Sequence, residues 1–221
     1  MLLELVRRDK EENSGLQTYL RHMMLVMAFD TRRRGRLITQ VELDQYTRWL
    51  SIAVTEALHH FVGHGAFAPR DEMRYRAVAG AHITHMLRDT FDDLQAGYYN
   101  VPREMLDAHH IGPQDVHTAG YRTWVRGRVR LARDDFKAGY GYFARVPNWR
   151  YRLAGLAYTA RFAWLLDTIE WDDYCLRPQY VEKNSVGTRL RMSWRVLSSM
   201  IQGRRLGTPR PTAVSHLLGR R

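Results

Sequence analysis

Cysteine is almost absent from this chain: Cys175 is the single one among 221 residues, so no disulfide can form within the molecule. That scarcity fits a reducing cytoplasm. Long hydrophobic runs are also missing, because no apolar stretch reaches the roughly 18 residues of a membrane-spanning helix. The opening sequence MLLELVRR is too short and too acidic for a signal peptide. We therefore expect a cytoplasmic protein, with peripheral contact at the inner membrane face as an additional option.

Acidic residues are fewer than basic ones, 23 against 34, which leaves a formal net charge of +11. Such a charge fits three kinds of partner: nucleic acid, an anionic membrane surface or a phosphorylated substrate. A high-GC genome that favours arginine over lysine explains the composition equally well. Nucleic acid ranks last, because the sequence contains no zinc-finger or aromatic RNA-binding motif.

Alternation of apolar and polar residues at period two is missing too, so the sequence predicts no strands and an all-α fold. Apolar residues instead recur at three and four. The expected helices cover residues 14–31, 39–62, 71–95, 113–142, 147–173 and 185–202. Thr39 is suited to cap the second helix, Pro113 and Pro147 to start the fourth and fifth, and Gly97 to end the third.

No internal linker is apparent, so we expect one helical domain over residues 1–202 and a basic flexible tail over residues 203–221. In the tail, arginines alternate with Leu206, Val214, Leu217 and Leu218. This pattern fits contact with an anionic membrane leaflet, and it equally fits a disordered basic end.

The stretch 82–97 carries the chemically distinctive residues. On one continuous helix a single stripe would hold all five of its acidic and imidazole side chains: His82, His85, Asp89, Asp92 and Asp93. Asp89 and Asp93 would lie one turn apart, with Cβ atoms about 6 Å from each other. Two carboxylates so placed repel unless a cation lies between them.

Mg²⁺ suits this pair, because it prefers oxygen ligands and recruits substrate phosphates. Arg88 borders the same face and could contact phosphate oxygens as a fork. Two alternatives stay open: a solvated helix face without a ligand, and a zinc or iron site formed by His82, His85 and Asp89.

Two runs in this region resemble a known family. Residues 84–93 read THMLRDTFDD and residues 97–106 read GYYNVPREML. They resemble the second aspartate-rich motif of squalene and phytoene synthases, approximately T-N-x-L-R-D-x-x-E-D followed by G-R-x-Y-x-P-x-x-x-L. Weaker likenesses extend the resemblance to about residues 30–183: Asp30, Arg36–Leu37, Glu42–Leu43 and Tyr46 upstream, and Leu165–Glu170, Tyr174 and Tyr180–Lys183 downstream.

The resemblance implies an isoprenoid synthase fold, with helices around a central cavity in which two prenyl diphosphates join head to head and release diphosphate. The substrate would be farnesyl or geranylgeranyl diphosphate, and Mg²⁺ the cofactor. Three sets of residues follow from the resemblance: Asp89, Asp93 and Arg88 for catalysis, Asp89, Asp93 and His85 for the metal, and His82, His85, Tyr46 and Arg36 for substrate binding.

The chain departs from the family pattern in two ways. No DxxxD motif precedes Asp89, although the family places its first aspartate-rich motif there. Five positions of the second motif also differ: His82 for glutamine, His85 for asparagine, Asp92 for glutamate, Tyr98 for arginine and Asn100 for tyrosine.

These departures allow three explanations. The chain is a truncated or mis-started member that lacks the N-terminal helices, a second subunit supplies the missing motif, or the protein is a relative that binds isoprenoid or lipid without turnover.

Overall fold

The computed structural model describes residues 14–63 and 68–180, and within these ranges every regular element is an α-helix. The prediction of an all-α fold is therefore confirmed. The elements are α2 (Gly15–Arg33), α3 (Gln40–Phe61), α4 (Met73–Arg88), α5 (Thr90–Ala96), α6 (Arg103–His109), α7 (Ala119–Arg145) and α8 (Trp149–Trp171). None of these described helices combines the length and apolar character needed to cross a bilayer. The expected helix 185–202 and the tail 203–221 lie outside the described residues.

Polar caps fix where the helices begin. The prediction that Thr39 caps the second helix is confirmed, and Thr39 forms a reciprocal capping box with Glu42 at the start of α3. The prediction that Pro113 starts a helix is wrong, because α7 begins only at Ala119, where Thr118 accepts a hydrogen bond from the Tyr121 amide. The intervening residues are held in a turn by the Asp115 carboxylate, which accepts from the Gly112 amide at 2.8 Å.

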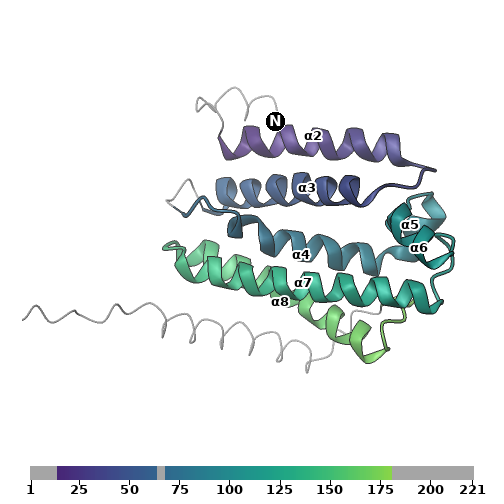
Figure 1. Ribbon diagram of the computed structural model, residues 1–221. Coiled ribbons are helices and arrows are strands. Elements are labelled where there is room, and N and C mark those ends of the chain that lie inside the picture. The colour runs from purple at the N-terminus through teal and green to yellow at the C-terminus, as the bar shows by residue number, and fades with distance from the viewer. Residues whose placement is uncertain (1–13, 64–67, 181–221) are drawn as a thin grey trace, which may run out of the picture.

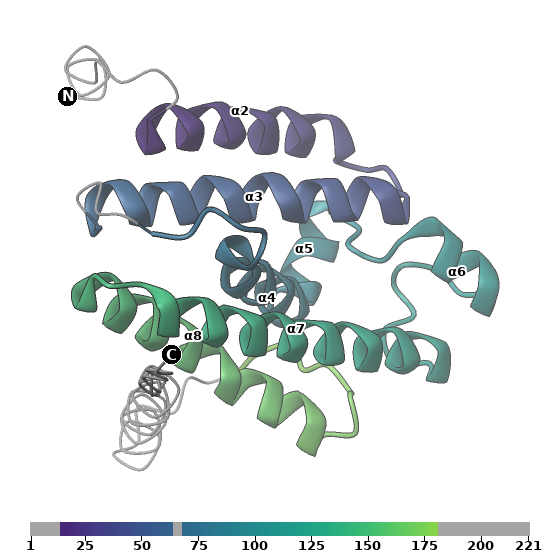
Figure 2. The ribbon, with the colours of Figure 1, turned by 60° about the vertical axis from the view of Figure 1, so that its left-hand side comes forward.

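The helices lie side by side in a row, in the order α2, α3, α4 and α7, with α8 packed against α4 and α7 (Figure 1). The short helices α5 and α6 lie beside one end of the long helices, at the right in Figure 1, and Figure 2 also shows α6 at that side of α3 and α7. The largest buried apolar cluster joins α4, α7 and α8 and includes Ile83, Leu87, Val129 and Leu166. This cluster packs α4 against α7 and α8.

A second apolar cluster lies between α2, α3 and α4. Phe29 of α2, Leu43 and Tyr46 of α3 and Met86 of α4 belong to it, together with Ile38 of the loop that joins α2 to α3. Because this cluster packs the three helices against one another, it sets the relative positions of the polar side chains on α2 and α4.

The predicted continuous helix 71–95 is interrupted at Asp89, whose φ of −92° and ψ of 9° separate α4 from α5. The Thr90 hydroxyl donates to the carbonyls of Met86 and Leu87, at 2.9 and 3.2 Å. A threonine that bonds back to the preceding turn competes with the backbone ladder and bends a helix. The expected end at Gly97 is confirmed, with φ of 83° in the left-handed region that glycine tolerates.

Candidate active site

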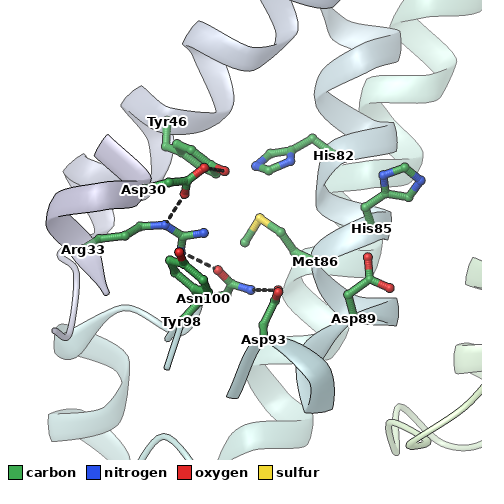
Figure 3. A pocket seen from close by; sticks show the side chains of 10 residues that line it. All are labelled: Asp30, Arg33, Tyr46, His82, His85, Met86, Asp89, Asp93, Tyr98 and Asn100. Carbon is green, nitrogen blue, oxygen red and sulfur yellow. Dashed lines mark hydrogen bonds and ion pairs between the residues drawn. The ribbon is translucent and has the colours of Figure 1, made fainter. Parts of the chain in front are cut away.

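A pocket of about 280 Å³ opens between α2, α3, α4 and the segment 89–100. Ten side chains line it: Asp30, Arg33, Tyr46, His82, His85, Met86, Asp89, Asp93, Tyr98 and Asn100 (Figure 3). All of them except Met86 carry a polar atom, so the pocket suits a polar or charged group. Five of the residues predicted from sequence are therefore brought together: Tyr46, His82, His85, Asp89 and Asp93.

The two aspartates lie on the α4–α5 side of the pocket (Figure 3). Asp89 is the residue at the helix break, and Asp93 follows one turn later in α5. The Asp93 carboxylate accepts a hydrogen bond from Nδ2 of Asn100 at 2.6 Å. Burial raises the pKa of Asp93, and the neighbouring negative charge of Asp89 raises it further, while the Asn100 hydrogen bond lowers it. A cation between the two carboxylates would relieve this repulsion.

On the opposite side, Arg33 of α2 is held in a polar network. Its Nε donates to Asp30 at 2.7 Å and its Nη1 donates to the side-chain oxygen of Asn100 at 2.8 Å. The Tyr46 hydroxyl donates to the other oxygen of Asp30 at 3.1 Å. Asn100 thus connects Arg33 of one wall to Asp93 of the other.

His82 lies in the interior of the pocket, with 8% of its surface exposed. Its Nε2 has no hydrogen-bond partner among the described residues, and its ring meets Tyr46 edge-on with 5.1 Å between centroids. Burial lowers the pKa of His82 to about 3, helped by the positive charge of Arg128, so the ring is neutral near pH 7. His85 packs its ring edge-on against Phe162, with centroids 4.6 Å apart.

Three predicted residues lie outside the pocket lining. Arg88 forms a two-pronged ion pair with its neighbour Asp89, at 2.6 and 2.8 Å, and does not itself line the pocket. Arg36 pairs with Glu42 at 2.9 and 3.2 Å near the surface. Asp92 is exposed. The expectation of a single stripe that includes Asp92 is therefore wrong, because the break at Asp89 changes the direction of the residues that follow.

The described residues contain no group of three His, Cys, Asp or Glu side chains close enough to hold a metal ion. The predicted ligand set of Asp89, Asp93 and His85 is therefore not assembled as a protein cage, and the zinc or iron set of His82, His85 and Asp89 is not assembled either. Mg²⁺ needs no such cage, because one or two carboxylates combined with water and substrate phosphates suffice. The two aspartates fit this kind of site.

Sequence reasoning missed several lining residues as parts of the site. Arg33 lies within a run of basic residues, RRRGR, in which the sequence marked only Arg36 as a site residue. Tyr98 and Asn100 were visible only as departures from a family pattern. Asp30 carried the clearest signal, because it belongs to the upstream segment that resembles the family.

The family model described as squalene/phytoene synthase matches residues 2–195 of the chain. No curated protein matches the chain.

Proposed function

Because the chain belongs to the squalene/phytoene synthase family, we propose that it is a Mg²⁺-dependent prenyltransferase that joins two prenyl diphosphates head to head and releases diphosphate. One observation carries this proposal: Asp89 and Asp93 line the same polar pocket as the buried Arg33. Carboxylates for a metal and a guanidinium for an anion are the two kinds of group that a metal diphosphate requires.

In this proposal each wall of the pocket has its own task. Asp89 and Asp93 bind Mg²⁺, which when bound offsets the negative charge that grows on the leaving diphosphate. Asn100 orients the Asp93 carboxylate through its 2.6 Å hydrogen bond. Arg88 limits the repulsion between the two aspartates by pairing with Asp89.

The pocket suits the diphosphate end of the substrate rather than its hydrocarbon chain, because Met86 is its single wholly apolar side chain. The prenyl chain, farnesyl or geranylgeranyl, would then extend beyond the residues that line it. His82, His85 and Tyr46 would contact the head of the substrate and exclude water from it. Arg36 stays a weaker candidate for substrate binding, since its guanidinium pairs with Glu42 outside the pocket.

A second function has its own support. The sequence before Asp89 holds no DxxxD motif, and every carboxylate of the pocket belongs to Asp30, Asp89 or Asp93. A protein with a single pair of metal-binding carboxylates, Asp89 and Asp93, can bind a prenyl diphosphate without turning it over, or turn it over only with a second subunit that supplies a second pair.

The test uses the purified chain with Mg²⁺ and labelled farnesyl or geranylgeranyl diphosphate, and measures both binding and released diphosphate. We expect Mg²⁺-dependent release that falls about 100-fold or more in Asp89→Asn and Asp93→Asn, in line with the loss of charge stabilisation at a reacting centre. Asp92→Asn is the matched control, because it removes the same charge from an exposed position.

The outcomes separate the two functions. Binding that depends on Asp89 and Asp93 without any release of diphosphate would favour the non-catalytic or partner-dependent protein. If the wild-type chain binds neither prenyl diphosphate in the presence of Mg²⁺, both functions are wrong.

A further inference from the structure

The two positions at which the motif after α5 departs from the family pattern contact the same side chain. Tyr98 stands where the pattern has arginine, and its ring centroid lies 4.9 Å from Cζ of Arg33. Asn100 stands where the pattern has tyrosine, and its side-chain oxygen accepts from Nη1 of Arg33 at 2.8 Å. The two departures therefore act on one feature, a guanidinium that comes from another helix.

We propose that Arg33 supplies the phosphate-binding cation of this pocket, in place of the arginine that the pattern places directly after Gly97. Tyr98 and Asn100 hold the relocated guanidinium in position. The inference rests on the proposed function, because it names the side chain that binds the phosphate of the same substrate.

The guanidinium of Arg33 is buried and held by several contacts. Its exposed fraction is 6%, and its Cζ lies 4.8 Å from the centroid of the Tyr46 ring as well as 4.9 Å from that of Tyr98. Asp30 accepts from Nε, and Asn100 accepts from Nη1. A guanidinium held on two faces and by two of its nitrogens loses little freedom when it binds a ligand.

The remaining nitrogen, Nη2, has the free donors. Within the described part of the chain it makes no hydrogen bond, and Figure 3 shows it directed into the pocket, toward His82 and Met86. These donors are therefore available to an acceptor that enters the pocket. A phosphate oxygen is the natural acceptor, because a charge-assisted bond to a guanidinium is among the strongest available.

The charges of the pocket specify the ligand more closely. Asp30, Asp89 and Asp93 bring three carboxylates to the lining, and two of them have an arginine partner, Arg33 for Asp30 and Arg88 for Asp89. The charge of the Asp93 carboxylate is left in excess and repels a bare anion, whereas a Mg²⁺ complex of diphosphate is not repelled. The ligand class is therefore a metal-bound diphosphate, with the metal on the Asp89–Asp93 side and a phosphate oxygen on Nη2.

The experiment is a calorimetric titration of the full chain with inorganic diphosphate, with and without Mg²⁺. For the wild-type chain we expect binding only with Mg²⁺. Arg33→Gln should weaken it about 10- to 100-fold, the range for one charge-assisted hydrogen bond to a phosphate. Arg32→Gln is the matched control, since Arg32 is the exposed neighbour on α2 and its loss changes the net charge equally.

A rescue variant tests relocation rather than simple damage. Arg33→Gln combined with Tyr98→Arg returns an arginine to the position directly after Gly97 and keeps the hydrogen bond of Asn100 to Asp93, so it should recover most of the lost affinity. A merely structural role of Arg33 predicts no recovery, and that result would overturn the proposal.

The remaining outcomes are also decisive. Should Arg33→Gln fail to fold, as judged by circular dichroism, Arg33→Lys takes its place. Lysine keeps the charge but cannot bond Asp30 and Asn100 while also directing a donor into the pocket, so we expect a loss of about 10-fold. Unchanged affinity in a folded Arg33 variant overturns this inference alone, whereas a wild-type chain that binds no Mg²⁺–diphosphate overturns the proposed function.

Discussion

Asn100 donates its side-chain amide to Asp93 at 2.6 Å and accepts from Arg33 at 2.8 Å, so one neutral residue connects the acidic wall of the pocket to the basic one. Asn100 follows the left-handed turn at Gly97, and its side chain is buried. The loop after α5 therefore fixes both the metal-binding and the phosphate-binding groups.

Replacement of Asn100 by alanine should weaken Mg²⁺–diphosphate binding about 10-fold, the usual cost of losing a hydrogen bond that orients a metal ligand. The Asn100 hydrogen bond lowers the pKa of Asp93, so its loss raises that pKa. Binding in the variant should consequently disappear at a higher pH as the solution is acidified. Titration calorimetry across pH checks this, with the exposed Gln95→Ala as control. An identical pH edge in both variants would contradict the role of Asn100.

Burial of His59 predicts that the unfolding free energy falls at acidic pH. Burial lowers the pKa of His59 to about 3, and the positive charges of Arg74 and Arg70 add to the effect. A base whose folded pKa is depressed contributes stability above its unfolded pKa of 6.5 and loses it as the pH falls toward the folded value. Between pH 6.5 and 5 this one histidine should cost about 2 kcal/mol of unfolding free energy.

The check is urea unfolding at pH 7.5 and pH 5 for the wild-type chain and His59→Phe. The variant loses a 3.0 Å contact with the Tyr142 hydroxyl at both pH values, yet its stability should fall less on acidification. His82, whose pKa is lowered to about 3 as well, keeps titrating in both proteins, so the slope is reduced rather than abolished. Equal slopes would show that His59 is not neutral in the fold.

The buried ion pair between Arg74 and Glu56 contributes to the stability of the fold. The two side chains are 7% and 13% exposed, and the guanidinium donates to both carboxylate oxygens, at 2.7 and 2.8 Å. Glu56→Gln leaves the buried Arg74 uncompensated and should cost about 3–5 kcal/mol. The pair between Arg48 and Glu72 is the control, because its side chains are 54% and 68% exposed. Glu72→Gln should cost no more than about 1 kcal/mol in the same denaturation assay.

The close approach of α4 and α7 depends on Gly139. A Cβ at this position would lie 2.9 Å from Cα of Ala77 and 3.0 Å from its amide nitrogen, both backbone atoms that cannot step aside. Gly139→Ala should therefore destabilise the fold by about 1–3 kcal/mol through overpacking. Gly127→Ala in the same helix meets no atom within 4 Å and should stabilise it by up to about 1 kcal/mol. Thermal unfolding of the two variants, with shifts of opposite sign, checks this assignment.

The sequence by itself determined the helical fold and much of the pocket. Period 3.6 identified the long helices. The cap at Thr39 and the glycine at position 97 marked two of their ends, and the spacing of Asp89 and Asp93 indicated a metal–phosphate site. These features depend on neighbours within one or two turns of the chain, and a local sequence pattern records such interactions.

The tertiary structure alone decided which residues face the pocket. Arg32, Arg33 and Arg34 are adjacent in sequence, yet only Arg33 turns inward, because Asn100, 67 residues further along, accepts from its guanidinium. Asp92 was lost from the predicted stripe because the Thr90 hydroxyl bends the helix by bonding the carbonyls of the preceding turn. Helical periodicity states which side chains share a face, but the direction of that face is set by partners distant in sequence.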